Sequence, residues 1–373
     1  MPNTMPDTMP DTMPDTMPDT MTAVVCHGPK DYRLERIALP TPGPNEVIIR
    51  VGACGICASD RKCWSGAGMF WNDPWVKAPV VAGHEFFGHV AAMGAGAADH
   101  FGVAMGDMVI AEQIVPCEKC RYCRSGTYWM CEKHDIFGFQ RDVAEGGMAD
   151  FMRFPANARV HKIPATMALA DAAIIEPLAC AIHTVERADP QLADVVVIAG
   201  AGPLGLMMAQ VTALRSPKLL VVIDPVPERR AVAETYGADI TINPLDQDAV
   251  ARVKAMTGGY GCDVYIEATG APAGVTQGLQ MIRKLGRFVE FSVFGHDTTA
   301  DWSIIGDRKE LDLRGAHLGP YCYPIAIDLL NRGKVTSKGI VTHSFPLAAW
   351  DEALRVSAEP TAIKVLLIPQ AVA

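Results

Sequence analysis

The sequence predicts an α/β protein in which a doubly wound parallel sheet is joined to a second, β-rich domain. Three observations lead to this prediction. The first part of the chain has short apolar runs between turn signals, whereas the part after about residue 174 alternates apolar strands with helical segments. The third observation is the length, because 373 residues exceed the roughly 250–300 that one hydrophobic core usually organises.

The first domain is expected to be β-rich from Thr22 to about Ile110, where apolar runs such as Glu46–Val51 alternate with turn signals. The residues before it, 1–20, repeat a Met-Pro-Asp/Asn-Thr unit with almost nothing apolar to bury, which predicts disorder. This repeat lacks the basic start and apolar stretch of a signal peptide. We interpret it as an artefact of start-site choice, with a functional tail as the alternative, and expect the folded protein to begin at Met21.

The second domain alternates strands and helices, which is the rhythm of a doubly wound parallel sheet. Val195–Ala199 and Leu219–Ile223 are continuous apolar runs typical of buried strands, and Leu206–Leu214 between them has a helical pattern. Two further strands are expected at Asp263–Glu267 and Arg287–Phe291.

The end of the chain, beyond about Pro320, contains a helical pattern at Ile325–Asn331 and a final strand at Ala362–Ile368. We expect this part to return to the first domain. The predicted organisation is a disordered repeat at 1–20, a first domain at 21–182, a second domain at 183–320 and a return to the first domain at 321–373.

Composition and charge exclude several classes of partner. The formal net charge is -9 and no basic domain is visible, so nucleic acid is not an expected partner. No apolar run approaches the roughly 18–20 residues that span a bilayer, so we expect no membrane partner. The 11 cysteines, four of them crowded between Cys117 and Cys131, indicate a metal site in a reducing compartment rather than a disulfide framework. A cytoplasmic protein is therefore expected.

A glycine-rich turn after Val195–Ala199 is the first cofactor signal. Gly200-Ala-Gly202-Pro-Leu-Gly205 follows a strand and opens a helix, which is the context of a Rossmann dinucleotide-binding turn rather than of an ordinary glycine turn. Asp224 ends the next strand, where an acid accepts hydrogen bonds from ribose hydroxyls and repels a 2′-phosphate, so NAD is favoured over NADP. The expected cofactor-binding residues are Gly200, Gly202, Pro203, Leu204, Gly205, Asp224 and Arg229.

Four cysteines follow one another at metal-binding spacing. Cys117, Cys120, Cys123 and Cys131 would surround one tetrahedral Zn²⁺ and leave no position open for substrate. Disulfides and coincidental thiols are the alternatives, and consecutive Cys-x-x-Cys steps are strained as disulfides. We expect a structural zinc that holds a loop.

A second candidate metal site combines two short motifs. Cys57 and Ser59 lie in Gly-Ile-Cys-Ala-Ser-Asp, and His84 and Glu85 lie in Gly-His-Glu. Thiolate, imidazole and carboxylate are ligands suited to a catalytic zinc, which keeps one position open and lowers the pKa of a bound hydroxyl. On these residues alone, a purely structural role is the alternative.

The motifs occur in an order that resembles a known family. Gly-Ile-Cys-x-Ser-Asp, Gly-His-Glu-x-x-Gly, the four-cysteine segment, Glu176-Pro-Leu and Gly-x-Gly-Pro-Leu-Gly are similar to those of zinc-containing medium-chain alcohol dehydrogenases, over nearly all of Met21–Ile368. The chain most resembles the branch of polyol (sorbitol, erythritol and threitol type) and threonine dehydrogenases. The resemblance implies a GroES-like catalytic domain, a Rossmann domain that binds NAD, two Zn²⁺ per chain, and assembly into homotetramers or homodimers.

The resemblance also implies roles for the site residues. Cys57 and His84 would bind the catalytic zinc, and either Glu85 or Glu176 would be the carboxylate ligand, with exchange between the two acids during turnover as an open alternative. Ser59 would be the first acceptor of the substrate proton.

One position departs from the family pattern. Relatives often carry a histidine three residues after the serine, where it completes a proton relay, and this chain has Lys62 there. The usual relay is therefore incomplete. Lys62 could hold a cofactor hydroxyl or phosphate, or be a solvated lysine.

The segment Trp64–Trp75 is expected to be an aromatic loop between the two zinc-ligand motifs. Its four large rings could form one wall of a substrate pocket, with ordinary loop packing as the alternative; they belong to Trp64, Phe70, Trp71 and Trp75. Together with the similarity to short-polyol dehydrogenases, this bulk favours a polyol of about four carbons, such as erythritol or threitol.

The predicted function is oxidation of a secondary hydroxyl of a small polyol or alcohol to the ketose, with hydride transfer to NAD. L-threonine 3-dehydrogenase, or another secondary alcohol dehydrogenase, is the runner-up because it shares the same residues. A protein that binds zinc and dinucleotide without catalysis is the alternative from another class. The intact Cys57, His84 and acid pair argue against that alternative.

Overall fold

The computed structural model describes residues 17–72, 75–295 and 297–369. The chain divides into two compact units, which we call unit 1 (Met1–Glu176 and Tyr323–Ala373) and unit 2 (Pro177–Cys322). Among the described helices, none combines the length and apolar character that crossing a membrane requires.

The start of the chain becomes regular slightly before Met21. Most of the predicted disordered repeat, residues 1–16, lies outside the described residues. Its last part is folded, because Thr20 begins the first strand opposite Ala38 and the carbonyl of Asp19 accepts a hydrogen bond from Leu39 N at 3.0 Å.

Unit 1 is built mainly from strands, as expected of the first domain. Its largest sheet has the order β10-β6-β5-β3-β18-β17, with β9 added beside β3, and smaller sheets have the orders β2-β1-β4 and β7-β8. All pairs are antiparallel except β17 with β18. The strands are β1 (Thr20–Gly28), β2 (Asp31–Ala38), β3 (Val47–Ile56), β4 (Val80–Val81), β5 (Glu85–Met93), β6 (Met108–Ala111), β7 (Ile114–Val115), β8 (Asp135–Ile136), β9 (Phe151–Phe154), β10 (Val160–Lys162), β17 (Val341–Pro346) and β18 (Lys364–Ile368).

Short helices connect these strands, and the last strand of the chain lies in the middle of the large sheet, next to β3. The helical segments of unit 1 are α1 (Ala58–Ser65), α2 (Gly68–Trp71), α3 (Ala97–Phe101), α4 (Arg121–Arg124), η1 (Tyr128–Met130), α5 (Leu169–Ala172), α11 (Tyr323–Asn331), η3 (Leu347–Ala349) and α12 (Trp350–Val356).

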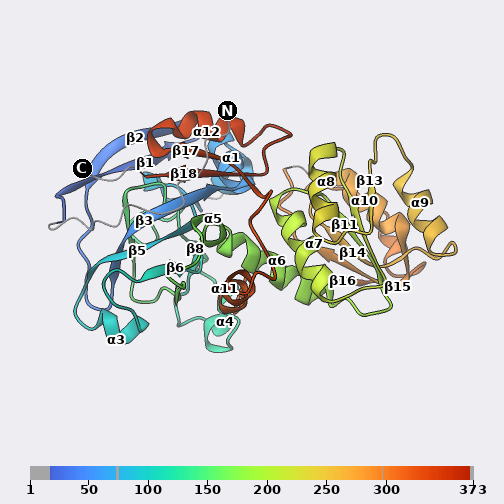
Figure 1. The fold of residues 1–373 in the computed structure, drawn as a ribbon, viewed down its shortest axis with the longest axis horizontal. Coiled ribbons are helices and arrows are strands. Elements are labelled where there is room, and N and C mark those ends of the chain that lie inside the picture. The colour runs from blue at the N-terminus through green and yellow to red at the C-terminus, as the bar shows by residue number, and fades with distance from the viewer. Residues whose placement is uncertain (1–16, 73–74, 296, 370–373) are drawn as a thin grey trace. The chain divides into compact units, whose positions relative to one another are not determined.

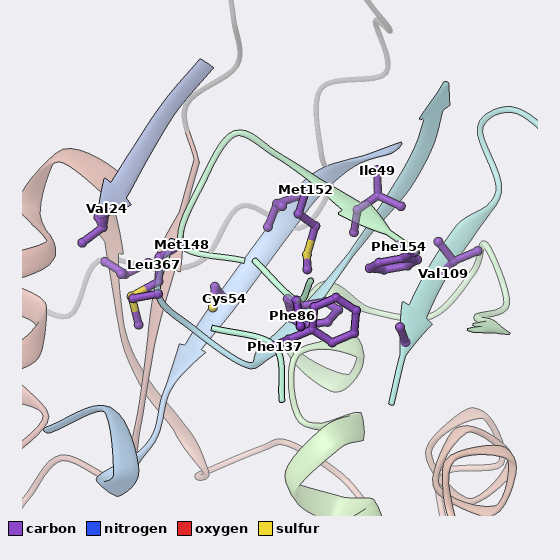
Figure 2. Close-up of a cluster of buried hydrophobic side chains, with 14 of the residues drawn as sticks. Val24, Ile49, Cys54, Phe86, Val109, Phe137, Met148, Met152, Phe154 and Leu367 are labelled. Carbon is purple, nitrogen blue, oxygen red and sulfur yellow. The ribbon is translucent and has the colours of Figure 1, made fainter. Parts of the chain in front are cut away.

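The main core of unit 1 gathers residues from the large sheet, from β1 and from segments between the strands (Figure 2), and also from α12. Phe86 of β5, Phe154 of β9 and Phe137 pack together with ring centroids 5.1 to 5.9 Å apart. Each ring is at most 2% exposed. Burial of such a ring contributes at most about 1.5–3 kcal/mol, and the three together hold β5 firmly against its neighbours.

Unit 2 contains a doubly wound sheet of parallel strands in the order β13-β12-β11-β14-β15-β16. Figure 1 shows the strands of this sheet among the helices of the unit. This is the strand order of a dinucleotide-binding Rossmann sheet, with the switch in winding between β11 and β14. The strands are β11 (Val195–Ala199), β12 (Leu219–Ile223), β13 (Ile240–Ile242), β14 (Cys262–Glu267), β15 (Ile282–Glu290) and β16 (Asp312–Gly315). The helical segments are α7 (Pro203–Leu214), α8 (Pro227–Thr235), α9 (Ala249–Met256), α10 (Pro272–Met281) and η2 (Trp302–Ile304), and α6 (Ile175–Ala188) leads into the unit.

The predicted fold class is confirmed: a parallel doubly wound sheet is combined with a β-rich unit. The expectation of a continuous loop at Trp64–Trp75 is wrong in part, because α1 continues to Ser65 and α2 forms at Gly68–Trp71. Two features explain why α1 ends at Ser65 and α2 follows it. Gly66 adopts a left-handed φ of 87° that ends α1, and Phe70 is buried, which draws the next turn inward. Residues 73–74 of this segment lie outside the described part of the chain.

Candidate active site

The end of β3 and the start of β5 bring the two predicted zinc motifs together. The strands pair antiparallel with Gly55 opposite Glu85. Cys57 follows β3 directly and caps α1, and His84 immediately precedes β5. This approach requires glycine, because a Cβ on Gly55 would lie 2.2 Å from Glu85 Oε2. Strand register thus joins motifs that are separated in sequence.

Three chemically different ligand atoms meet at this point. The thiol of Cys57, an imidazole nitrogen of His84 and a carboxylate oxygen of Glu85 all lie within 4.8 Å of one another, and we call these residues the Cys57 group. His84 Nδ1 is buried and makes no hydrogen bond of good geometry. A half-buried sulfur beside a buried carboxylate and a buried imidazole is a donor set that fits Zn²⁺.

Asp60 positions both halves of the Cys57 group. Its carboxylate accepts a hydrogen bond from Cys57 N at 2.8 Å, and its other oxygen lies 3.4 Å from His84 Nδ1. Burial, the largest single effect, would lower the pKa of His84, but the charge and hydrogen bonding of Asp60 and then of Cys57 together raise that pKa well above its usual value. Sequence reasoning placed Asp60 in a motif but gave it no role, because its contact with His84 depends on the fold.

Ser59 and Lys62 lie on the first turns of α1, after Cys57. Ser59 Oγ is 3.3 Å from His84 Nε2, so the hydroxyl lies beside the Cys57 group. Lys62 is half-buried, and burial lowers the pKa of its ammonium. The histidine that a proton relay usually contains is therefore replaced by a partly buried cation.

Lys364 is a site residue that sequence reasoning missed. Its ammonium donates to Glu85 Oε2 at 2.5 Å and to the carbonyl of Ile56 at 3.4 Å, and both charged side chains are 1% exposed. Burial disfavours the ammonium, but Glu85 and then the Cys57 thiol keep the pKa of Lys364 above its usual value. The available signal was a charged residue inside the otherwise apolar final strand, β18.

Glu176, the other candidate carboxylate, lies in the first turn of α6 and is 5% exposed. It accepts a hydrogen bond from the side-chain amide of Gln113, whose carbonyl accepts one from Tyr323 OH at 2.6 Å. Glu176 is not among the residues whose ligand atoms lie within 4.8 Å of one another at Cys57. Its charge nevertheless contributes to the raised pKa of Lys364, so it acts on the same buried region.

The four predicted cysteines converge around α4. Their sulfur atoms lie within 4.8 Å of one another, and the Cys120 and Cys123 sulfurs are 3.5 Å apart. In a tetrahedral zinc site the sulfur atoms are separated by roughly 3.8 Å, so the spacing fits one ion. Backbone N–H groups, that of Cys123 foremost, lower the pKa of Cys120 to about 6. Burial, together with the neighbouring cysteines, instead raises the pKa of Cys123 to about 12. The fold thus brings together the four predicted residues, Cys117, Cys120, Cys123 and Cys131.

The glycine turn of unit 2 joins β11 to α7. Gly200 has a left-handed φ of 100°, and a Cβ on Gly205 would lie 1.9 Å from the Gly200 carbonyl oxygen. Gly202 caps α7, Pro203 is its first residue and Leu204 its second. Apart from Gly202 itself and its two chain neighbours, no described residue has an atom within 4 Å of a Cβ on Gly202, so its missing side chain leaves open space beside the helix N-terminus. A helix N-terminus with open space beside it fits a pyrophosphate.

Asp224 follows β12 and faces the glycine turn. Its carboxylate accepts hydrogen bonds from Ala201 N at 2.7 Å and Val226 N at 2.8 Å, and it is 5% exposed. Arg229 and Arg230 lie on α8, where the guanidinium of Arg230 donates to the carbonyls of Asp224 and Pro225. The acid is thus held at the carboxyl end of β12, where ribose binds in such folds.

Comparisons with known proteins agree with this geometry. Residues 43–165 match the family model described as alcohol dehydrogenase GroES-like domain, and residues 203–332 match that of zinc-binding dehydrogenase. The erythritol/L-threitol dehydrogenase of Mycolicibacterium smegmatis is 50% identical over 93% of this chain and 97% of its own length. The chain belongs to the zinc-binding medium-chain alcohol dehydrogenases.

Two further relatives show how far this family likeness extends. A sorbitol dehydrogenase of Halalkalibacterium halodurans is 32% identical over 92% of this chain and 97% of its own length. A crystal structure of a zinc-binding dehydrogenase from Sinorhizobium meliloti, bound to NADP, superposes with a TM-score of 0.86 at 27% identity and covers 94% of this chain and 99% of that one. The predicted family is confirmed, and this dehydrogenase is an enzyme that uses zinc and a nicotinamide dinucleotide.

An aromatic cluster adjoins the Cys57 group of this dehydrogenase. Phe70 of α2 stacks on Phe139 with centroids 5.7 Å apart, and Trp75 lies 4.9 Å from the same ring. Phe139 in turn lies 5.5 Å from the His84 ring. Two of the four predicted wall residues, Phe70 and Trp75, therefore contact the ring of Phe139, which lies next to His84. Trp64 instead packs against the main core of unit 1. The fourth, Trp71, donates its indole N–H to the carbonyl of Cys63.

Proposed function

We propose that this dehydrogenase oxidises a secondary hydroxyl of a small polyol of the erythritol or L-threitol type to the ketose, with NAD⁺ as the hydride acceptor. The alcohol loses a hydride to the nicotinamide and a proton to the protein, so the products are a ketose, NADH and H⁺. The observation that carries the proposal is 50% identity to an erythritol/L-threitol dehydrogenase over 93% of the chain, together with the intact Cys57 group.

The residues of the Cys57 group and their neighbours Ser59 and Asp60 have separate tasks in this proposal. Cys57, His84 and one of the two acids hold a zinc ion, which supplies Lewis-acid chemistry to a bound hydroxyl. Ser59 accepts the substrate proton as it releases its own proton to solvent, and its place 3.3 Å from His84 supports this role. Asp60 keeps Cys57 and His84 in position.

We propose that the two acids share the ligand role. Glu85 belongs to the Cys57 group but is held by Lys364, whereas Glu176 is held by Gln113 and lies outside the group. Each acid thus has a buried partner that can keep it charged while the other binds the ion. A second Zn²⁺, bound by the four cysteines, has a structural role and gives two ions per chain.

NAD is proposed in preference to NADP. The carboxylate of Asp224 stays at the end of β12 through two backbone hydrogen bonds, and a negative charge there opposes a 2′-phosphate. The guanidinium of Arg230, which could bind that phosphate, donates instead to two backbone carbonyls. Comparing kcat/KM for NAD⁺ and NADP⁺ tests this preference directly.

We also propose that the protein assembles into a homo-oligomer and that it resides in a reducing compartment, the cytoplasm. The outer strand β16 leaves one edge of the parallel sheet open, and Leu313 on it is 43% exposed, which supports pairing with a second copy. None of the 11 cysteines, all in the described part of the chain, forms a disulfide, which supports the cytoplasm. Light scattering of the purified protein measures the number of subunits and distinguishes a tetramer from a dimer.

A substrate panel tests the central proposal. Initial rates with NAD⁺ are measured on erythritol, L-threitol, sorbitol, L-threonine and ethanol at equal enzyme concentration. We expect the highest kcat/KM with one of the two tetritols, because the aromatic cluster beside His84 favours a short substrate. A preference for L-threonine would establish the runner-up activity, and a preference for ethanol would remove the polyol assignment altogether.

A further inference from the structure

A third group of metal-ligating side chains lies in unit 2. An imidazole nitrogen of His183, a carboxylate oxygen of Glu186 and the sulfur of Cys322 all lie within 4.8 Å of one another. We call these residues the His183 cluster. Neither the four-cysteine segment nor the Cys57 group contributes to it, because both belong to unit 1.

Two of the three side chains come from one face of α6. His183 and Glu186 are three residues apart in this helix, so their side chains lie next to each other on its surface. Cys322 lies in the segment that follows β16, and its side chain is buried, with the residue 1% exposed. Its sulfur lies 3.7 Å from Glu186 Oε2. Sulfur and oxygen ligands of one tetrahedral zinc are roughly 3.5 Å apart, so this pair is already at ligand spacing.

The segment that carries Cys322 is held closely against α6. Gly319 lies so near the helix that a Cβ there would be 2.5 Å from the carbonyl carbon of Ala179. Leu318 and Tyr321 adopt left-handed φ values of 57° and 61°, which are unfavourable for residues with side chains. Such a backbone persists only where the surroundings hold it, so the approach of Cys322 to His183 is built into the local fold.

Charge and access also suit a divalent cation. A Cys322 thiolate and the Glu186 carboxylate would balance two positive charges. The neighbouring guanidinium of Arg187 donates to the carbonyl of Gly315 at 3.0 Å. Burial, and then the charge of Arg187, lower the pKa of His183, which favours the neutral imidazole that binds metals. Glu186 is exposed and His183 is half-buried, so an ion can reach the cluster from solvent. Sulfur, nitrogen and oxygen together favour Zn²⁺ over Mg²⁺ or Ca²⁺.

We propose that His183, Glu186 and Cys322 form a third zinc-binding site, separate from the two sites of the proposed function, that fastens the segment Gly319–Cys322 to α6. The ion binds to unit 2 near the point where the chain leaves it, because Cys322 is the last residue of that unit. The site does not take part in alcohol oxidation. Its occupancy raises the stability of the folded chain, since a ligand that binds only the folded state stabilises it.

Metal counting on the intact holoenzyme tests this site. Wild type, Cys322→Ser and His183→Gln are dialysed against buffered free Zn²⁺, and bound zinc per chain is measured. Cys262→Ser is the matched control, because Cys262 is a fully buried cysteine of unit 2 outside the cluster. We expect both cluster variants to bind one equivalent fewer than wild type and the control to bind as many as wild type. Equal counts in wild type and both cluster variants would overturn the proposal.

Cobalt(II) provides a readout of the ligands themselves. Co²⁺ added to wild type that carries two zinc ions per chain, with the third equivalent removed by dialysis, should develop the absorption of a thiolate-bound cobalt ion. Its affinity for His183→Gln should be lower by at least about 10- to 100-fold, the loss that even an outer partner causes. No thiolate absorption in wild type would contradict the site. Polyol oxidation is assayed on the same samples. Its absence from wild type with this site occupied would count against the proposed function alone.

Discussion

At the scale of single residues, the buried ion pair of Lys364 and Glu85 contributes to the stability of the folded chain. It also holds one of the proposed zinc ligands, Glu85. Both side chains are 1% exposed and their charged atoms are 2.5 Å apart. Replacing the lysine by an apolar residue of similar length would leave a carboxylate buried without its partner, which typically costs about 3–5 kcal/mol. We therefore expect Lys364→Met to lower the free energy of unfolding by about this amount, as measured by urea denaturation.

The double variant Lys364→Met/Glu85→Gln is the control for that measurement. Removing both charges removes the unpaired carboxylate, so we expect the double variant to recover much of the lost stability. A double variant as unstable as Lys364→Met alone would show that the lysine acts through packing and not through its charge.

Glu290 is a residue whose protonation should be visible in stability. It ends β15 beside Glu267 of β14, and burial, reinforced by the charge of Glu267, raises the pKa of Glu290 from 4.5 to about 7. A raised folded-state pKa contributes stability that is complete below the unfolded value and is lost as pH rises through the folded value. Between about pH 5 and about pH 8, wild type should lose more stability than Glu290→Gln. Parallel pH profiles of urea unfolding for the two proteins would refute this assignment.

At the scale of elements, two glycines of the turn between β11 and α7 have different roles: one allows close packing and the other leaves space for the cofactor. A Cβ on Gly205 would collide with the Gly200 carbonyl at 1.9 Å, whereas one on Gly202 meets no atom of the described residues within 4 Å beyond its chain neighbours. Gly205→Ala should therefore lower stability by roughly 1–3 kcal/mol through overpacking. Gly202→Ala should leave the melting temperature unchanged and weaken NADH binding about tenfold, because its methyl group occupies space near the pyrophosphate.

NADH fluorescence titration and thermal unfolding of both variants measure these effects. The prediction fails if Gly202→Ala binds NADH like wild type, or if Gly205→Ala is as stable as wild type.

Elements that are marked by a pattern in consecutive residues could be predicted from the sequence. Features that depend on contacts between residues far apart in the sequence could not. The strand at Leu219–Ile223 has its predicted bounds because a fully apolar run ends at an acid. The approach of the four cysteines to one another could be predicted because they fall within one short segment of the chain. Helix α2 was missed because it has only four residues and begins with a glycine, and the burial of Phe70 within it depends on the fold. Lys364 was missed because β18 reaches β3 only in the folded sheet.

At the scale of the whole molecule, the proposed tasks are divided between the two units. The Cys57 group and the four cysteines belong to unit 1, and the glycine turn with Asp224 belongs to unit 2. Each unit has its own hydrophobic core, one around Phe86 and Phe154 and the other around Tyr265 and Phe288. A change confined to the Cys57 group should therefore leave dinucleotide binding intact.

The Cys57→Ser variant tests the central claim most directly, when zinc content, NADH binding and polyol oxidation are measured on one preparation. We predict one equivalent of zinc fewer than in wild type, unchanged NADH affinity, and turnover lower by at least about 100-fold, as expected when a group that stabilises charge is lost. A variant that oxidised erythritol or L-threitol at the wild-type rate would contradict chemistry at the Cys57 group.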